Sequence, residues 1–479
     1  MSVWEALGDL DRTQPRMGEQ LICALRDAIE QGRLPAGTRL PSSRDLAVDL
    51  RVSRGLVVGA YERLIAEGRL AAKRGAGTVV TGQVDQAVAS EDQPDSMYIA
   101  EAARTSGADA AVAPLRPGIP DLGMFPRTAW RRAYERALIF AADADFDYGD
   151  PAGAFRLRAE LSAYLGRMRA ARVDVDRLLV TSGATQSFSL VAEVMVASGM
   201  TRIGVEDPGG RAVADCFASR GVVAVPIPVA GDGIEVGRLE RSRVSAVVLT
   251  PAHQFPTGVV LAPGRRAALL DWARRTGGIV VEDEYDAELR YDREPVGCMQ
   301  GLAPEHVILV GSVSRTLAPA LRLGWLVSPT SWRAALRAAK SAADGGGPTL
   351  EQLAFAELLA GAAYDRHLRR VRRTMRERRE ALVTAVRTYL PSARITGVAA
   401  GLHVTVELPQ GGSDLELVER ARALGLAPLA LSELTRRADG PQGLVLGYAP
   451  HSPHELARAV RALALVAGDK AFPARRRGR

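Results

Sequence analysis

Residues 278–289, GIVVEDEYDAEL, hold an apolar run that ends in three acids and a tyrosine, namely Glu282, Asp283, Glu284 and Tyr285. A short apolar run bounded by polar residues is typical of a strand that is buried on both faces of a sheet. A carboxylate at the end of a strand is, taken alone, more often a surface or capping group than part of a binding site. The stretch therefore predicts a buried strand, and its meaning depends on the segments around it.

The segments around this strand alternate between strand-like and helix-like patterns. Residues 177–190, RLLVTSGATQSFSL, predict a strand, a tight turn and a helix, and the turn places four residues at the helix N-terminus: Ser182, Gly183, Ala184 and Thr185. A helix N-terminus can bind an anion, although a Ser-Gly turn is usually only a cap. Residues 306–329, HVILVGSVSRTLAPALRLGWLVSP, predict a strand, a serine-rich loop and a second strand. This alternation, which begins after residue 113, predicts an α/β domain.

The N-terminal part has a different pattern, with three short helices and a hairpin. Residues 17–31 predict a first helix, and Ser42 and Ser43 cap a second helix that follows a Pro-Gly turn. Residues 53–68 predict a third helix, and the two short segments after it predict a β-hairpin wing. Together these elements predict a winged helix-turn-helix.

The start of the third helix is where a helix-turn-helix protein meets the bases of DNA. Ser53 and Arg54 lie there; an arginine can bond guanine bidentately, and a serine hydroxyl can bind phosphate. Residues 33–82 carry nine Lys/Arg against four Asp/Glu, a net charge of +5. The alternative is a three-helix bundle that binds no nucleic acid. The capping serines, Arg54 and the glycine-rich basic wing occur together, and this combination favours DNA binding.

Charge and composition divide the chain into four parts. Residues 1–82 form the expected DNA-binding domain. Residues 83–112 are an expected linker, because residues 83–110 carry one Arg against six acids and lack sustained periodicity. Residues 113–470 form the expected α/β domain, and residues 471–479 form a basic tail that is expected to be solvated.

The composition excludes several classes of protein. The three cysteines are far apart in the sequence, so they suggest neither a disulfide framework nor a zinc site, and they fit a reducing cytosol. The N-terminus carries acids early and has no apolar core, so it does not match a signal peptide. The apolar runs are too short to span a bilayer. A cytoplasmic protein is therefore expected.

The N-terminal segment resembles the winged helix of GntR-type transcription regulators. The similar runs are LPSSRDLA at 40–47, VSRGLV at 52–57, YERLIAEG at 61–68 and KRGAGTVV at 73–80. The resemblance implies that five residues contact double-stranded operator DNA: Arg44, Ser53, Arg54, Arg74 and Gly75.

The large domain resembles the aminotransferase-like domain of fold-type I pyridoxal phosphate enzymes. The resemblance rests on the order and spacing of the three segments above together with YGDPAG at 148–153 and TPAHQFPTG at 250–258. With the winged helix in front, the whole chain resembles the MocR subfamily of GntR regulators. Pyridoxal phosphate needs a carboxylate at its ring nitrogen, a donor at its 3-oxygen, and amides with an arginine fork at its phosphate. By resemblance, Asp283 and Tyr285 meet the ring, and the phosphate is bound by Ser182, Gly183, Ala184, Thr185, Ser312 and Arg322.

Three positions depart from the family pattern. Arg315 stands where the Schiff-base lysine follows the second serine of a Ser-x-Ser-Lys loop, and a guanidinium, which stays protonated, forms no such linkage. Gly210 stands where a tyrosine near the ring is common. The strand at residues 443–449 lacks the arginine that aminotransferases provide for the substrate carboxylate. The chain has three lysines, none of them in this loop: Lys73, Lys340 and Lys470.

These features leave three functions open. The large domain of a regulator senses a small molecule, either noncovalent pyridoxal phosphate or an amino-acid-like effector; or the chain is an aminotransferase with a DNA module; or the large domain is a dimerisation scaffold without ligand. The missing lysine argues against the enzyme, because that lysine is both Schiff-base partner and proton-transfer base. The retained Asp283, Tyr285, Ser312 and Arg322 favour the sensor. The resemblance also implies a homodimer, which suits two winged helices on two half-sites.

Overall fold

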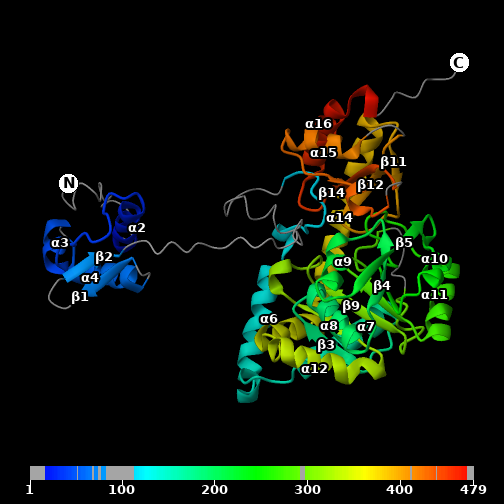
Figure 1. Cartoon of the computed structure of the whole chain (residues 1–479), viewed down its shortest axis with the longest axis horizontal. Coiled ribbons are helices and arrows are strands. Elements are labelled where there is room, and N and C mark those ends of the chain that lie inside the picture. Colours follow the sequence, from blue (N-terminus) through cyan, green and yellow to red (C-terminus); the bar gives the residue numbers. More distant parts are fainter. Residues whose placement is uncertain are drawn as a thin grey trace. The chain divides into compact units, whose positions relative to one another are not determined.

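The computed structural model describes residues 17–50, 52–66, 69–73, 77–81, 113–291, 297–409, 413–437 and 440–471. The chain divides into two compact units, Met1–Pro94 and Asp95–Arg479. Figure 1 shows both units, with the first in blue and the second in cyan through red. The expected linker at 83–112 and the tail from residue 472 lie outside the described residues.

The first unit is a helical bundle with a two-stranded wing. Its elements are α2 (Met17–Glu30), α3 (Ser43–Leu50), α4 (Arg54–Ala66), β1 (Leu70–Lys73) and β2 (Gly77–Val80). Strands β1 and β2 pair antiparallel. Ser42 Oγ accepts a hydrogen bond from the amide of Asp45 at 3.2 Å, and Ser53 Oγ accepts one from the amide of Leu56 at 3.4 Å. These two N-caps begin α3 and α4. Fully buried leucines from three helices form the core: Leu21, Leu25, Leu46 and Leu64.

The second unit is built on an eight-stranded mixed sheet of order β3-β10-β9-β8-β7-β4-β5-β6. Its strands are β3 (Leu178–Thr181), β4 (Arg202–Asp207), β5 (Val223–Ala230), β6 (Gly233–Ile234), β7 (Ala246–Leu249), β8 (Ile279–Glu284), β9 (Val307–Ser312) and β10 (Gly324–Val327). Strands β9, β8, β7, β4 and β5 run parallel, and β10 is antiparallel to both of its neighbours. This sheet is the one that the apolar run at 278–289 predicts.

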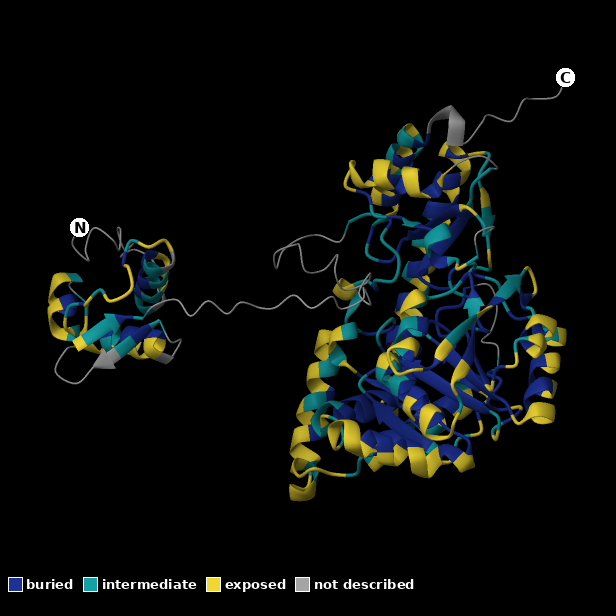
Figure 2. Cartoon of the chain, in the orientation of Figure 1, coloured by how far each residue is buried: buried dark blue, intermediate teal, exposed yellow. Residues whose placement is uncertain are grey.

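Helices cover the sheet on both faces, because its strands are apolar on both sides. In β9, Ile308 and Val310 join one core cluster and Leu309 joins another. Figure 2 shows the strands buried and the outer helix faces exposed. The helices of this unit are α6 (Arg127–Phe140), α7 (Phe155–Arg169), α8 (Ala184–Ala197), α9 (Arg211–Ala218), α10 (Val236–Arg241), α11 (Pro263–Thr276), α12 (Arg333–Asp344), α13 (Thr349–Ala360), α14 (Ala363–Tyr389), α15 (Asp414–Arg422) and α16 (Pro453–Ala471).

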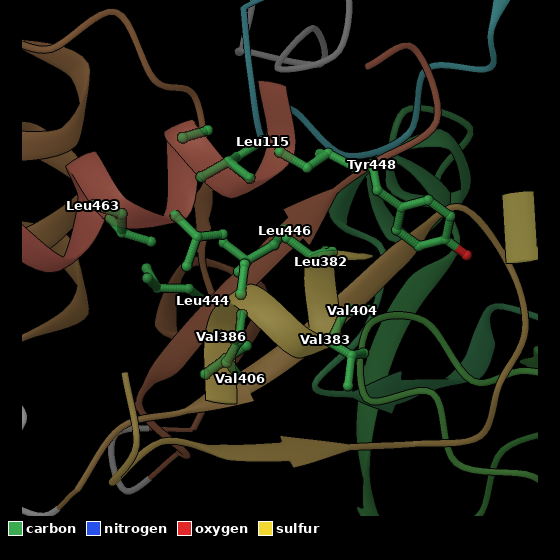
Figure 3. Close-up of a cluster of buried hydrophobic side chains, with 14 of the residues drawn as sticks. Leu115, Leu382, Val383, Val386, Val404, Val406, Leu444, Leu446, Tyr448 and Leu463 are labelled. Atoms are coloured by element: carbon green, nitrogen blue, oxygen red, sulfur yellow. The ribbon is translucent and has the colours of Figure 1, made fainter. Parts of the chain in front are cut away.

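A smaller antiparallel sheet of order β11-β12-β14-β13 forms the C-terminal part of this unit. Its strands are β11 (Arg394–Thr396), β12 (His403–Glu407), β13 (Leu429–Ala430) and β14 (Gly443–Gly447). Figure 3 shows its core, a cluster that includes Val404 and Leu446 of the sheet, Leu382 of α14 and Leu463 of α16. Leu115 is buried in the same core, and its carbonyl accepts a hydrogen bond from the amide of Gly447 at 2.9 Å. The segment that begins at residue 113 is thereby held against the small sheet.

Candidate functional site

The segments singled out in the sequence meet at one end of the large sheet, where β3, β8 and β9 end and β10 begins. The ends of β8 and β9 lie together, since Glu284 pairs with Gly311. Gly324, the first residue of β10, pairs with Ser312 on one side and with Thr181 on the other. Asp283 is therefore three strand spacings, about 14 Å, from the end of β3. Tertiary structure thus brings together residues that are more than a hundred positions apart.

The N-terminus of α8 is a candidate anion site, called here the anion cradle and made up of the first amides of α8 together with Ser182, Ser312 and Arg322. Gly183 has φ +101° at the helix N-cap, and a Cβ there would lie 3.2 Å from Nη2 of Arg322. The first amides of a helix have no acceptor within the helix. The guanidinium of Arg322 makes no hydrogen bond or ion pair to the described residues. Both kinds of donor therefore remain available for an anion.

A chain of polar contacts that sequence reasoning missed holds the turn before α8. The amide of Ser182 donates to Oε1 of Gln186 at 2.7 Å, and Nε2 of Gln186 donates to Asp344 at 2.6 Å. Lys340, which is 1% exposed, holds the same carboxylate at 2.6 Å. The ammonium of Lys340 is therefore committed to an ion pair. In the sequence, only the i,i+4 spacing of Lys340 and Asp344 indicated this ion pair.

Asp283 is buried at the other end of the site, and its Oδ1 has no hydrogen-bond partner among the described residues. Burial, together with the charge of Asp286, raises the pKa of its carboxyl from 3.8 to about 7, while Arg315 opposes the shift. A buried polar atom without a partner is costly and is rare in folded proteins. A ligand atom that donates a hydrogen bond or carries positive charge would remove this cost.

Tyr285 lies in a small polar network that the sequence did not reveal. Its hydroxyl is 3.0 Å from Nδ1 of His253, and that nitrogen is 2.8 Å from Oδ2 of Asp286. His253 and Asp286 are both buried. The loop at 250–258 supplies the histidine and so lies beside Tyr285. His253 lies in the run HQFPTG, and Tyr285 and Asp286 lie in the run EYDAEL. The contact between these two runs is visible only in the fold.

Arg315 lies inside the same site. It follows β9 and is half-buried, and a Cβ at Gly118 would lie 3.4 Å from its Nη2. Burial lowers the pKa of the guanidinium, whereas the charges of Asp286 and Asp283 raise it. Within the described residues, no hydrogen bond or ion pair reaches the guanidinium. Gly118, which sequence reasoning did not single out, marks the segment that borders this arginine.

The other two departures from the family pattern, Gly210 and the strand at 443–449 without an arginine, can also be located in the structure. A Cβ at Gly210 would have its nearest neighbours at 3.8 and 3.9 Å, so the backbone there has room for a side chain. Val445 of β14 is buried in an apolar cluster. Arg437 donates to Asp207 at 2.8 Å, and Arg436 lies 3.5 Å from Asp215. The two arginines upstream of β14 are thus already paired with acids.

The predicted DNA-contacting residues of the first unit are at its surface where the structure describes them. Arg44 in α3 is exposed, and so are Ser53 and Arg54 at the start of α4. Arg74 and Gly75 lie outside the described residues. Three of the five residues are therefore placed, and they flank the two helix N-termini of the helix-turn-helix.

Asp283→Asn is expected to stabilise the second unit by about 1–3 kcal/mol at pH 8 and by less at pH 5. With its pKa raised to about 7, Asp283 keeps a proton in the folded state that the unfolded chain loses above its ordinary pKa. Stability from this group is therefore present at low pH and lost as pH rises toward 7. Urea unfolding of the ligand-free chain at both pH values measures the difference. An equal effect at pH 5 and pH 8 would contradict the assignment.

Two family models match this chain. The family "Aminotransferase class I and II" matches residues 118–463, and "Bacterial regulatory proteins, gntR family" matches residues 17–80. Both matches agree with the two units of the fold. No helix within the described ranges is long and apolar enough to cross a membrane, and the same ranges hold no group of His, Cys, Asp or Glu suited to a metal ion.

The chain is also similar to proteins of known name along most of its length. The "HTH-type pyridoxine biosynthesis transcriptional regulator PdxR" of Corynebacterium glutamicum is 32% identical over 91% of this chain and 93% of that protein. The "Probable rhizopine catabolism regulatory protein MocR" of Rhizobium meliloti is 30% identical over 95% of this chain and 94% of that protein. These similarities confirm the predicted combination of a GntR-type domain with an aminotransferase-like domain.

Among solved structures, the chain is similar to LysN, the alpha-aminoadipate aminotransferase of Thermus thermophilus, complexed with N-(5'-phosphopyridoxyl)-L-leucine. The sequences are 28% identical, the TM-score is 0.66, and the match covers 74% of this chain and 91% of that one. The second unit therefore has the predicted fold.

Proposed function

The chain belongs to the MocR subfamily of GntR-type transcription regulators, and on this premise we propose that its second unit senses a small molecule that carries a phosphopyridoxyl group or resembles an amino acid. Its relatives include two named HTH-type transcriptional regulators and one named a probable regulatory protein, so DNA-binding transcription regulation is its activity. The cytoplasm is the proposed compartment, since the operator is there.

One observation carries the proposal of a ligand: the site keeps polar groups that the described residues do not satisfy. Oδ1 of Asp283 is buried without a partner, and Arg322 makes no ion pair beside the open end of α8. A domain used only as a scaffold gains nothing from such groups, because each unpaired buried polar atom costs stability. The sensor is therefore favoured over the ligand-free scaffold.

The residues present fit a phosphopyridoxyl group held without a covalent bond. Ser182, Ser312, Arg322 and the first amides of α8, those of Ala184 and Thr185, would hold the phosphate, and Asp283 would meet the ring nitrogen. Tyr285 would face the 3-oxygen. Bound pyridoxal phosphate supplies an electron-withdrawing ring and an aldehyde, but Arg315 forms no Schiff base with that aldehyde.

We therefore propose binding without transaminase activity. A titration of the wild-type chain with pyridoxal phosphate, followed by visible absorbance, tests the ligand. The absence of any spectral change would favour the scaffold.

The chain is proposed to act as a homodimer on a two-fold operator. Large apolar side chains are exposed at the end of α6 and in the segments after it: Leu138, Ile139, Phe140, Phe146, Tyr148 and Phe155. Such a concentration of exposed apolar surface is typical of a protein–protein interface. A second copy of the chain would cover it and would bring two winged helices to two half-sites.

Arg54→Ala is expected to weaken operator binding by about 1–3 kcal/mol and to relax specificity at one base position, if Arg54 bonds a guanine edge. Arg54 is exposed at the start of α4, where a recognition helix meets the major groove. Gel-shift titrations over a series of salt concentrations measure the effect. Arg74→Ala is the matched control: a phosphate contact would weaken all sequences alike and lower the salt slope by about one. Equal binding by wild type and Arg54→Ala would refute the role.

A further inference from the structure

Arg315 is a half-buried cation to which the described residues offer no bonding partner. Two carboxylates, Asp283 and Asp286, lie close enough for their charges to act on it. Neither is within ion-pair distance, and Asp286 is engaged with His253 at 2.8 Å. The five donors of the guanidinium therefore remain available beside Gly118. A guanidinium in this position is matched by an anion with two oxygens in one plane.

The two arginines just upstream of β14 are not available for a carboxylate, because each is already engaged with an acid. Val445 of β14 lies in an apolar cluster, and Arg436 and Arg437 hold Asp215 and Asp207. The anion cradle is distinguished from this place by its neighbours: Arg322 faces Gly183 at the start of α8, whereas Arg315 faces Gly118. The site thus presents two distinct anion-binding points, Arg322 with α8 and Arg315, with the unpaired Asp283 as an acidic third point.

We propose that Arg315 binds the carboxylate of an amino-acid portion of the effector, so that the preferred ligand is a phosphopyridoxyl amino acid and not free pyridoxal phosphate. This inference rests on the proposed function, which places the phosphate at the anion cradle. The three points of the site match three of the polar groups of such a ligand: phosphate at Arg322, ring nitrogen at Asp283 and carboxylate at Arg315.

An arginine at position 315 suits the binding of this ligand better than a lysine would, for two reasons. A lysine amine would compete with the amino acid for the aldehyde carbon, whereas the protonated guanidinium does not attack it. The guanidinium also offers a planar fork for a carboxylate, which an ammonium does not. The amino acid and pyridoxal phosphate condense in solution to an imine with loss of one water molecule, and Arg315 takes no part in that step; the phosphopyridoxyl amines used below are stable analogues of this imine.

A matched pair of stable ligands tests the inference. N-phosphopyridoxyl-alanine and N-phosphopyridoxyl-ethylamine differ by the carboxylate alone, and neither has an aldehyde. Isothermal titration of the full chain is expected to show about 10- to 100-fold tighter binding of the alanine conjugate, the size of a hydrogen-bonded contact to a charged group. Equal affinity of the wild-type chain for the two ligands would overturn the inference.

Variants assign the discrimination to the arginine. Arg315→Gln is expected to bind the two conjugates equally, and Arg315→Lys, which keeps the charge without the fork, is expected to keep part of the preference. Arg333→Gln removes one exposed positive charge from α12 and is expected to behave as wild type. A preference that survives in a folded Arg315→Gln chain would refute the role of Arg315.

Failure of the proposed function gives a different result. Arg322→Gln is expected to weaken both conjugates by the same factor and to leave their ratio unchanged, because it acts on the phosphate they share. If neither conjugate binds the wild-type chain, the phosphopyridoxyl site itself is wrong, and the inference falls with it. If both bind with equal affinity, the phosphopyridoxyl site stands and only the role of Arg315 is refuted.

Discussion

Arg315→Lys is expected to form a covalent adduct with pyridoxal phosphate that the wild-type chain does not form. The substitution places an amine on the turn after β9, beside the segment around Gly118. The charges of Asp283 and Asp286 act on this position, and the anion cradle is unchanged. A lysine amine adds to an aldehyde, which an arginine guanidinium does not do. Borohydride reduction followed by intact mass is expected to show near-complete modification of the variant and none of the wild type.

Three controls make this result specific. Peptide mapping is expected to place the adduct at position 315, since Lys340 is buried in its ion pair with Asp344. Arg315→Met is expected to give no adduct. Adding Arg322→Ala to Arg315→Lys is expected to abolish it at low ligand concentration, because the phosphate loses its arginine. A borohydride-stable adduct on one lysine of the wild-type chain at full occupancy would contradict the prediction and reopen the aminotransferase alternative.

Arg169→Met is expected to lower the free energy of unfolding of the second unit by about 3–5 kcal/mol, the cost of leaving a buried partner charge unpaired. Arg169 is 2% exposed and forms an ion pair with buried Glu284, with its Nε 2.8 Å from Oε2. The neighbouring Glu282 and Glu288 are also buried, and burial raises the pKa of each to about 7. Without the guanidinium, three carboxyls would share a buried space with less positive charge to stabilise them.

Tryptophan fluorescence during urea unfolding measures this change, because four of the five tryptophans lie in the second unit: Trp130, Trp272, Trp325 and Trp332. The double variant Arg169→Met with Glu284→Gln is expected to recover much of the loss, since it removes both charges of the pair. Arg333→Met is the exposed control and is expected to change stability by less than about 0.5 kcal/mol. A loss below about 1 kcal/mol in Arg169→Met would show that the acids are already neutral at the pH of the measurement.

The sequence predicted the elements that carry the site, because their signals are local. The apolar run before Asp283 predicted β8, the Ser-Gly turn predicted the start of α8, and the capping serines predicted the starts of α3 and α4. Each depends on the period of apolar residues or on a side chain that caps its own helix. The sequence also shows directly that the loop after β9 contains no lysine.

Which polar groups have partners can be seen only in the three-dimensional fold. His253 and Asp286 are 33 positions apart, and Gly118 and Arg315 are nearly two hundred apart, so no local pattern joins them. Pairing between such residues depends on strand order and on the connections between strands, which are set by burial of the whole core. The family, the two domains and the lack of a lysine in the loop after β9 can therefore be read from the sequence alone. The fold alone decided that Arg315 and Arg322 remain unpaired among the described residues while Arg436, Arg437 and Lys340 are paired, because a charge is satisfied by neighbours in space and not by neighbours in sequence.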